Sequence, residues 1–592
     1  MAIRLCIFIT LVFGATNCEV SQTGKRPHIV FILADDLGFG DVGWNNKLMA
    51  DVTKRLARIA ARGVTLSQYY VQQVCTPSRS ALMTGLYPYH LGRQKGTIKP
   101  RQPTGLTLNR TLLSERLQSL GYRTHVVGKW HLGFCNLKYT PTHRGFDTFR
   151  GFYTGAETYY DHSRAAGGNK YYDFRVNNTV DVTARGHYST DVITKESLKI
   201  IKLHSQNNQT EPLFLYIPYQ ATHAPLEAPE NEYEEILKSG NAPRDIYRAM
   251  LSRLDKGVRA VVRRLKTSGM WERTLLVFST DNGGAVSRSG SNHPLRGTKG
   301  TLFEGGTHGV GFVAGGFLGR KKGVTHGGLF HITDWYPTLL AAATDTEDHN
   351  DLDGVNQWEM LKNLTHSKRL ETVYNLKIIP VSGAIRIGDY KLMFARKFNK
   401  DGWYNIDDHG PPVFEPHNKT VRIRYAFGLG KSHIVFSDDI TIRNSVMRNK
   451  KSRYDENLIL KSGGMIALKN QRSAEIFGIT EEDEQDDEDG DEEKLDNKLL
   501  NEIRRNLDKN SSMNEYQILF NSRWPKLKKH LFNIADDPEE RTDLQEELPE
   551  VLEKMRLKVL DMYGTFVKRD YPDISNQSDP ARFGGNWSPG WC

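Results

Sequence analysis

Four short apolar runs constrain the fold of this 592-residue chain most strongly. They are continuous rather than alternating and rich in branched and aromatic residues, a pattern typical of central strands covered on both faces. Longer amphipathic stretches lie between them and give a β-α-β rhythm, which predicts an α/β fold with a large, mostly parallel sheet flanked by helices. The predicted strands are His28–Leu33, Thr124–Val127, Leu213–Ile217 and Thr274–Ser279, and the predicted helices are Thr111–Leu120, Thr190–Leu203 and Ile246–Leu265.

Polar side chains follow all four predicted strands. In an open α/β sheet the ligand crevice lies outside the carboxyl ends of the parallel strands. We therefore expect these distant residues to converge on one rim. They are Asp35 and Asp36 after the first strand, Lys129 and His131 after the second, His223 after the third, and Asp281 and Asn282 after the fourth.

The first 18 residues predict a secretory signal peptide, because a short basic start precedes the apolar run Leu5–Ala15 and then small or polar residues. That run is too short to span a bilayer, and no later stretch is long enough. A soluble protein of the secretory pathway without a transmembrane anchor is expected. Many glycosylation sequons agree with this. They lie at Asn109, Asn177, Asn208, Asn363, Asn418, Asn510, Asn576 and Asn586.

The pattern changes after about residue 375. A hairpin over Ala384–Phe394, a strand over Leu531–Ile534 and a helix over Pro549–Tyr563 predict a smaller α+β domain over residues 376–592, after a large domain over residues 24–375. The smaller domain is interrupted by an insert around residues 431–523. Within it, Glu481–Glu493 is almost entirely acidic and cannot form a core, so the insert is expected to be disordered.

The formal net charge is +10 despite this acidic tract. A basic surface can steer anionic partners, and for a secreted chain a sulfated glycan is a better candidate than nucleic acid. Surplus Lys and Arg that merely solvate the surface explain the charge equally well.

Cys75 is followed two residues later by Pro77 and four residues later by Arg79. This spacing is the signature with which sulfatases make their nucleophile. The chain resembles the sulfatases of the alkaline-phosphatase superfamily, and among them the arylsulfatase B group of N-acetylgalactosamine-4-sulfatases and near relatives. The matching segments, within residues 27–375, are Ala34–Gly38, Cys75–Gly85, Gly128–Gly133, Asp281–Gly284 and Pro294–Lys299; later matches are Gly388–Lys391 and Asp536–Leu544.

The resemblance implies an alkaline-phosphatase-like fold and a catalytic domain over residues 24–375. It also implies that a formylglycine-generating enzyme converts Cys75 to formylglycine, an aldehyde that hydrates to a gem-diol. One Ca²⁺ per chain is implied, and oxygen ligands do suit such a hard cation. The alternative is that each acidic pair caps a turn after its strand. The implied metal ligands are Asp35, Asp36, Cys75, Asp281 and Asn282.

The catalytic roles also come from the resemblance. Arg79 would stabilise the hydrated aldehyde, and Lys129 would hold the nucleophilic group. His131 would be the base that later releases sulfate, while His223 and Lys299 would bind sulfate and protonate the leaving oxygen. The implied reaction is a double displacement, which divides one hard step into two easier ones.

The function expected from this set is hydrolysis of sulfate esters on glycosaminoglycan sugars, with N-acetylgalactosamine 4-sulfate as the candidate substrate. Two alternatives stay open: a phosphoesterase of the same superfamily and a non-catalytic protein that binds sulfated glycans. The lysosome is the expected location, and the cell exterior is also permitted. The oligomeric state is left open.

Four departures from the family pattern put substrate choice and pocket shape in doubt, and one of them is the acidic insert, which is not part of the family core. The segment Asp51–Leu56 lacks the usual start of its helix, and His308 stands where the family motif begun by Glu304 has Arg. Most cysteines that form disulfides in the arylsulfatase B group are absent. If Cys75 is converted, the mature chain keeps only Cys135 and Cys592, which either pair or stay free.

Overall fold

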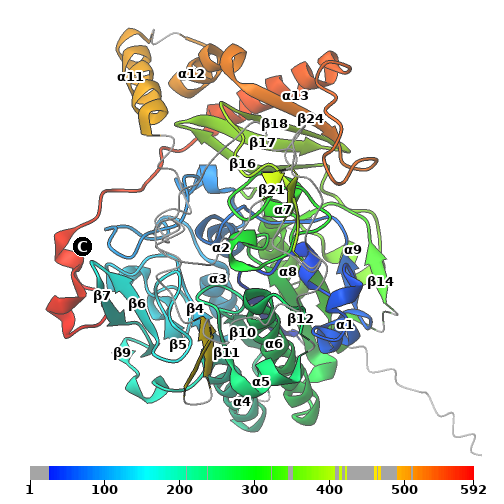
Figure 1. The fold of residues 1–592 in the computed structure, drawn as a ribbon, viewed down its shortest axis with the longest axis vertical. Coiled ribbons are helices and arrows are strands. Elements are labelled where there is room, and N and C mark those ends of the chain that lie inside the picture. The colour runs from blue at the N-terminus through cyan, green and yellow to red at the C-terminus, as the bar shows by residue number, and fades with distance from the viewer. Residues whose placement is uncertain are drawn as a thin grey trace, which may run out of the picture.

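A large sheet flanked by helices forms the body of the protein, and a smaller sheet with its own helices lies against one end of it (Figure 1). The protein is described here by a computed structural model. The described residues are 26–207, 210–236, 238–319, 321, 323–344, 351–406, 413–415, 421–422, 459–462, 465–468, 490–507 and 511–592. The predicted signal peptide lies outside them, as do Asn208, Asn418 and Asn510.

The central sheet has ten strands in the order β14-β2-β13-β12-β1-β10-β4-β5-β8-β9. Its middle is parallel, because β1 pairs in parallel with both β10 and β12, and β10 pairs in parallel with β4. The four predicted strands are confirmed. The bounds are β1 His28–Ala34, β2 Val64–Leu66, β4 Arg123–Lys129, β5 Thr148–Phe152, β8 Arg175–Val176, β9 Thr179–Val180, β10 Leu213–Pro218, β12 Thr274–Thr280, β13 Gly311–Ala314 and β14 Val324–His326.

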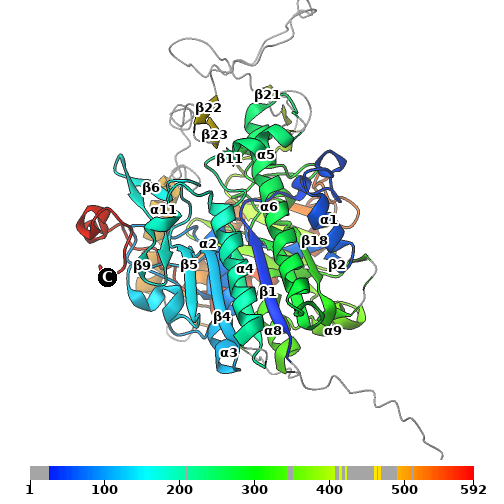
Figure 2. The same ribbon diagram turned by 90° about the horizontal axis from the view of Figure 1, so that it is seen from below.

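Helices cover both faces of this sheet, which confirms the predicted α/β class. One face packs on α1, α4 and α6, of which α1 and α6 lie side by side (Figure 2). The other face packs on α2, α3 and α8. No helix in the described part of the chain is long and apolar enough to span a bilayer. The bounds are α1 Lys54–Ala60, α2 Cys75–Thr84, α3 Leu113–Ser119, α4 Ser189–Asn207, α6 Ala242–Thr267 and α8 Trp335–Thr344.

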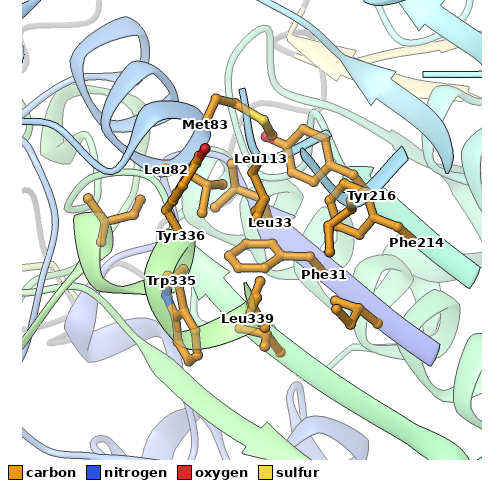
Figure 3. Packing of buried hydrophobic residues seen from close by; sticks show 14 of the residues in the cluster. Phe31, Leu33, Leu82, Met83, Leu113, Phe214, Tyr216, Trp335, Tyr336 and Leu339 are labelled. Atoms are coloured by element: carbon orange, nitrogen blue, oxygen red, sulfur yellow. The ribbon is translucent and has the colours of Figure 1, made fainter. Parts of the chain in front are cut away.

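The continuous apolar run of β1 is explained by burial on both sides. Val30 and Ile32 belong to the core beneath α4 and α6, whereas Phe31 and Leu33 point to the opposite core. Figure 3 shows Phe31 among side chains from α2, α3, α8 and β10, with its ring centroid 5.8 Å from that of Trp335. Since strand side chains alternate between faces, a strand covered on both faces must be apolar at every position.

The smaller domain is an antiparallel sheet in the order β16-β17-β18-β24, covered by α13. The predicted hairpin is confirmed as β17 and β18, the predicted strand as β24 and the predicted helix as α13. The bounds are β16 Glu371–Ile378, β17 Val381–Ile387, β18 Tyr390–Ala395, β24 Lys528–Asn533 and α13 Pro549–Met562.

The expectation of disorder over residues 431–523 is wrong for the four segments that the structure describes there. The strands β22 Ile459–Ser462 and β23 Met465–Leu468 pair with each other, and β23 also pairs with β11 Glu227–Pro229 of the large domain. Residues Gly490–Asn506 form α11 and Glu515–Arg523 form α12. The helix α12 buries Leu519 and Phe520 in the core of the smaller domain, and the Arg523 Nε of α12 lies 2.6 Å from the Asp496 Oδ1 of α11. These contacts exist only because the sheet supplies an apolar surface, which the composition of the insert does not reveal. Most of the acidic tract lies outside the described residues.

A fully buried ion cluster joins the two domains. The Lys391 Nζ of β18 lies 2.9 Å from Glu304 Oε1 of the large domain and 2.8 Å from Glu540 Oε1. Burial raises the pKa of Glu540 to about 7, and the charge of Glu304 adds to this while Lys391 opposes it. Burial also disfavours ionised Glu304, but Lys391 and His308 outweigh it and hold the pKa of Glu304 well below its usual range. The cluster therefore keeps one carboxylate charged and leaves the other able to titrate.

The C-terminal segment returns to the large domain and is fixed there by a disulfide between Cys135 and Cys592. Trp587 is buried in the core, and the Gly590 N–H donates to Cys135 O at 2.8 Å. The sequence left this pairing open, and the structure shows that it forms.

We expect Cys592→Ser to lower the free energy of unfolding by about 2–4 kcal/mol, because the disulfide closes a loop of 457 residues. Urea denaturation of the variant and of wild type checks this. Reduction of wild type should reproduce the loss, and Cys135→Ser, which breaks the same disulfide, should lower the free energy of unfolding by a similar amount. Equal midpoints for Cys592→Ser and wild type would contradict it.

The pKa of Glu540 also sets a pH dependence of stability. Its folded pKa of about 7 exceeds the ordinary value, so its contribution is present at low pH and is lost as the pH rises through 7. Glu540→Gln removes this ionisation and keeps the side-chain shape. Between pH 5 and pH 8, wild type should lose roughly 2 kcal/mol relative to the variant. If the free energy of unfolding in urea changes with pH in the same way for wild type and Glu540→Gln, the raised pKa of Glu540 is contradicted.

Candidate functional site

The four predicted strand ends meet because β4, β10, β1 and β12 are neighbours in the sheet. Asp35 follows β1, Lys129 ends β4, and Asp281 follows β12. The Lys129 Nζ donates to Asp35 Oδ2 at 2.6 Å, and the Asp36 N–H lies 3.4 Å from Asp281 Oδ1. His223 reaches the same place from the loop after β10, so residues up to 246 positions apart share one buried rim.

Cys75 is the first residue of α2, whose ten residues are all buried. Its Sγ lies 3.4 Å from Asp35 Oδ1 and 3.5 Å from Lys129 Nζ. Burial, together with the charges of Asp281 and Asp35, raises the pKa of the Cys75 thiol well above its usual value. The thiol therefore stays protonated, which is unsuitable for a cysteine that attacks as a thiolate.

Arg79 lies one helical turn beyond Cys75 and ties three strand ends together. Its Nε donates to Asp281 Oδ2 at 3.0 Å, its Nη1 donates to Lys129 O at 3.1 Å, and its Nη2 lies 3.6 Å from Asp35 Oδ2. Because the guanidinium is planar and always charged, it can hold these groups in fixed relative positions.

Lys299 and His223 approach Asp36 from two loops. The Lys299 Nζ lies 2.9 Å from Asp36 Oδ1, and the His223 Nε2 lies 3.7 Å from Asp36 Oδ2. The His223 Nδ1 lies 2.7 Å from Ala224 O, which places a proton on Nδ1 and leaves Nε2 facing the site. Two groups able to contact an anion or move a proton thus border the same carboxylate.

His131 is held in a left-handed backbone conformation with φ of +57°, which is uncommon for a residue with a side chain. Its Nε2 lies 3.2 Å from Ile98 O, and its buried Nδ1 has no hydrogen-bond partner among the described residues. Burial and the nearby charges of Lys129 and Arg164 lower the pKa of His131 well below its usual value. The imidazole is therefore neutral and able to accept a proton.

The donor atoms near Cys75 fit a hard divalent cation. Asp35, Asp36, Cys75 and His223 each offer a ligand atom within 4.8 Å of the others. Burial and the charge of Asp281 raise the pKa of Asp35 to about 7, a penalty that a cation among these carboxylates would offset. The Oδ1 of Asn282 is also buried there without a hydrogen-bond partner. The group of four includes His223 and does not include the predicted ligand Asp281. Its two carboxylates and the Asn282 oxygen are ligands of the kind that Ca²⁺ and Mg²⁺ take, whereas its thiol and imidazole are of the kind that zinc takes.

Two supporting residues escaped the sequence reasoning. The Tyr247 OH of α6 donates to Asp41 Oδ2 at 2.6 Å and accepts from Thr222 Oγ1 at 2.8 Å, which ties the loop after Asp36 to the His223 loop. Arg164 lies close enough to His131 to lower its pKa. Tyr247 lies inside a helix and Arg164 in a polar hairpin, so no local motif distinguished either one.

The sulfatase family model matches residues 27–346. Arylsulfatase J of Mus musculus is 43% identical over 355 residues, which cover 60% of this chain and 58% of that protein. The N-acetylgalactosamine-6-sulfatase of Mus musculus is 30% identical over 320 residues, covering 50% of this chain and 59% of that protein. The solved structure of Ps i-CgsB in complex with k-i-k-neocarrahexaose has a TM-score of 0.65 at 21% identity and covers 95% of this chain and 97% of that one, which shows the shared fold.

The match covers more than half of the chain and contains every predicted site residue. Placement within the arylsulfatase B group in particular stays a prediction. The alignment with arylsulfatase J covers 58% of that protein, so this chain matches little more than half of its length. On the strength of the family model and of the site just described, the chain belongs to the sulfatase family.

Proposed function

We propose that this protein hydrolyses sulfate esters of sugars, with residue 75 as the nucleophile after conversion to formylglycine. One observation carries the proposal: the Cys75 Sγ lies beside both Asp35 and Lys129 at the buried start of α2, where its thiol stays protonated. The oxygen that replaces sulfur on conversion would occupy this place, within reach of the Lys129 ammonium.

The side chains around residue 75 would have different roles in the reaction, according to their charge. Lys129, which already contacts both Asp35 and residue 75, would hold one hydroxyl of the hydrated aldehyde toward the sulfur atom. Arg79 would fix Lys129 and Asp281 around it. Neutral His131 would take the proton of the second hydroxyl, so that the carbonyl forms again as sulfate leaves.

His223 and Lys299 lie on the other side of Asp36 and would contact the sulfate and protonate the departing sugar oxygen. A divalent cation held by Asp35, Asp36, Asp281, Asn282 and residue 75 would neutralise charge on the sulfate oxygens. We propose Ca²⁺, because the donor set is rich in oxygen.

The substrate class is proposed from relatives and charge. One relative is named for N-acetylgalactosamine 6-sulfate, and one structure of the same fold contains a carrageenan-type hexaose. We propose a sulfated glycosaminoglycan, with N-acetylgalactosamine 4-sulfate as the first candidate. Phosphoesterases of the same superfamily typically have Ser or Thr where Cys75 stands, so this residue argues against that alternative. A purely glycan-binding protein would not need the buried pair of Lys129 and His131.

Location and modification follow as proposals from the same assignment. The predicted signal peptide leads the chain into the secretory pathway, where a formylglycine-generating enzyme would act on Cys75. The lysosome is the proposed destination, and secretion is the alternative.

Protein made in a secretory pathway should carry formylglycine at position 75, and mass spectrometry of the peptide containing Cys75 checks this. Cys75→Ser, which supplies one hydroxyl instead of two, should lower kcat for 4-nitrophenyl sulfate by roughly a thousandfold or more. Lys202→Gln on the exposed part of α4 is the control for an unrelated substitution. An unmodified thiol in fully active protein would refute the mechanism.

Removing the cation should abolish most activity, and Ca²⁺ should restore it. We expect Asn282→Ala to raise the Ca²⁺ concentration for half-maximal activity roughly tenfold, because it removes the one unpaired buried oxygen of the site. The melting temperature should rise with Ca²⁺ in wild type and rise less in the variant. Asn506→Ala, on the exposed surface of α11, is the matched control. Full activity in excess chelator would count against a cation.

A further inference from the structure

A cleft of about 350 Å³ opens at the edge of the central sheet, between α1 and the strands β2 and β14. It is built from segments adjoining the catalytic rim. Phe39 follows Asp36 by three residues, and Val310 N–H donates to the Thr280 Oγ1 that precedes Asp281. The cleft is nonetheless separate from the site described above, because none of the proposed catalytic or metal-binding residues lines it.

Two aromatic side chains line this cleft, and each is fixed from behind by another ring. Trp44 is half-buried, with its centroid 6.1 Å from that of the buried Phe312. The Phe39 centroid lies 4.9 Å from that of His308. A rigid indole partly open to solvent offers the apolar surface on which the face of a sugar ring can stack.

The rest of the lining is small or polar. Ala57 and Ala61 leave room on the side of α1, while Asn45, Ser67 and Thr325 bring an amide and two hydroxyls. Since Asn45 Nδ2 already donates to Phe39 O and Ser67 Oγ to His326 O, Asn45 and Ser67 offer a sugar hydroxyl their acceptor oxygens and the second amide N–H. An aromatic wall with scattered neutral polar groups is thus suited to carbohydrate rather than to a purely apolar ligand.

Cations border the cleft along α1 and the turn after it. Lys54 lies three residues before the lining residue Ala57, and Arg58 lies three residues before the lining residue Ala61, so each is a neighbour of the wall on the surface of the helix. Arg62 follows Ala61 in the turn after α1. Lys54 lies one helical turn before Arg58. All three are exposed, and among the described residues they form no ion pair. The helix α1 contains no acidic residue, and its remaining cation, Arg55, is paired with buried Asp255.

We propose that this cleft, with Trp44 as its stacking surface and Arg58 and Arg62 as its anion contacts, is an accessory site for a sulfated sugar unit of a glycan chain. The proposal goes beyond hydrolysis at residue 75, although its choice of glycan rests on the proposed function. The cleft would hold one part of a chain while another sulfated sugar occupies the catalytic rim. Binding at a second site on the same chain raises the effective concentration of substrate at the first.

The test uses full-length Cys75→Ser protein labelled with fluorotryptophan, so that binding is measured without turnover. The ¹⁹F resonance missing from Trp44→Phe identifies Trp44. A chondroitin 4-sulfate hexasaccharide should shift this resonance, and a hyaluronan hexasaccharide, which has no sulfate, should not. Arg58→Gln with Arg62→Gln should raise the Kd from this titration roughly tenfold at low ionic strength. The pair Lys526→Gln with Lys528→Gln, exposed on the smaller domain, should leave it unchanged.

Measurements of enzyme activity distinguish a failure of the accessory site from a failure of the proposed function. In otherwise unmodified enzyme, the Arg58 and Arg62 variant should keep the kcat/KM of wild type for 4-nitrophenyl sulfate and show a raised KM for polymeric chondroitin sulfate. A protein that binds the hexasaccharide at Trp44 and hydrolyses no sulfate ester would refute the proposed function and leave the accessory site standing. Any of three outcomes would overturn the accessory site. The Trp44 resonance does not shift, hyaluronan binds as well as chondroitin sulfate, or the only binding that depends on the two arginines is to phosphatidylserine vesicles.

Discussion

The buried salt bridge between Lys129 and Asp35 is the interaction on which the rest of the site depends. Both side chains are fully buried, and their atoms lie 2.6 Å apart. Breaking such a pair leaves an uncompensated charge in the interior, which costs several kcal/mol. It joins the ends of β4 and β1 across β10 and lies directly beside residue 75. The strand order therefore fixes where residue 75, the neighbouring carboxylates and Arg79 can lie.

The site carries more buried charge than stability alone would favour. Asp35 and Asp281 lie close together, and Asp36 and His131 both have positive φ. Each of these features lowers the free energy of unfolding, and the rigid scaffold must offset this loss. Such strained residues are found mostly at functional sites. The scaffold here is a sheet covered on both faces, together with Tyr247, which ties the Asp36 and His223 loops to α6.

The smaller domain supports the site indirectly, through contacts with the segment that carries Lys299. Its Lys391 pairs with Glu304, five residues after Lys299, and the Glu540 carboxylate accepts from the Glu304 N–H at 2.7 Å. The segment that carries Lys299 toward Asp36 is thus anchored from across the domain boundary. This gives the smaller domain a physical part in placing Lys299, although none of the rim residues described above belongs to that domain.

The sequence by itself determined the central strands and the convergence of their polar ends, and it proposed the site residues around Cys75. It could do so because full burial demands continuous apolar runs and because the nucleophile motif is local. Only the tertiary structure decided that Cys135 pairs with Cys592, that α11 and α12 fold on the smaller sheet, that Tyr247 and Arg164 serve the site, and that Trp44 and Arg58 border one cleft. These features depend on contacts between residues far apart in the chain, and local composition does not encode which distant surface a side chain meets.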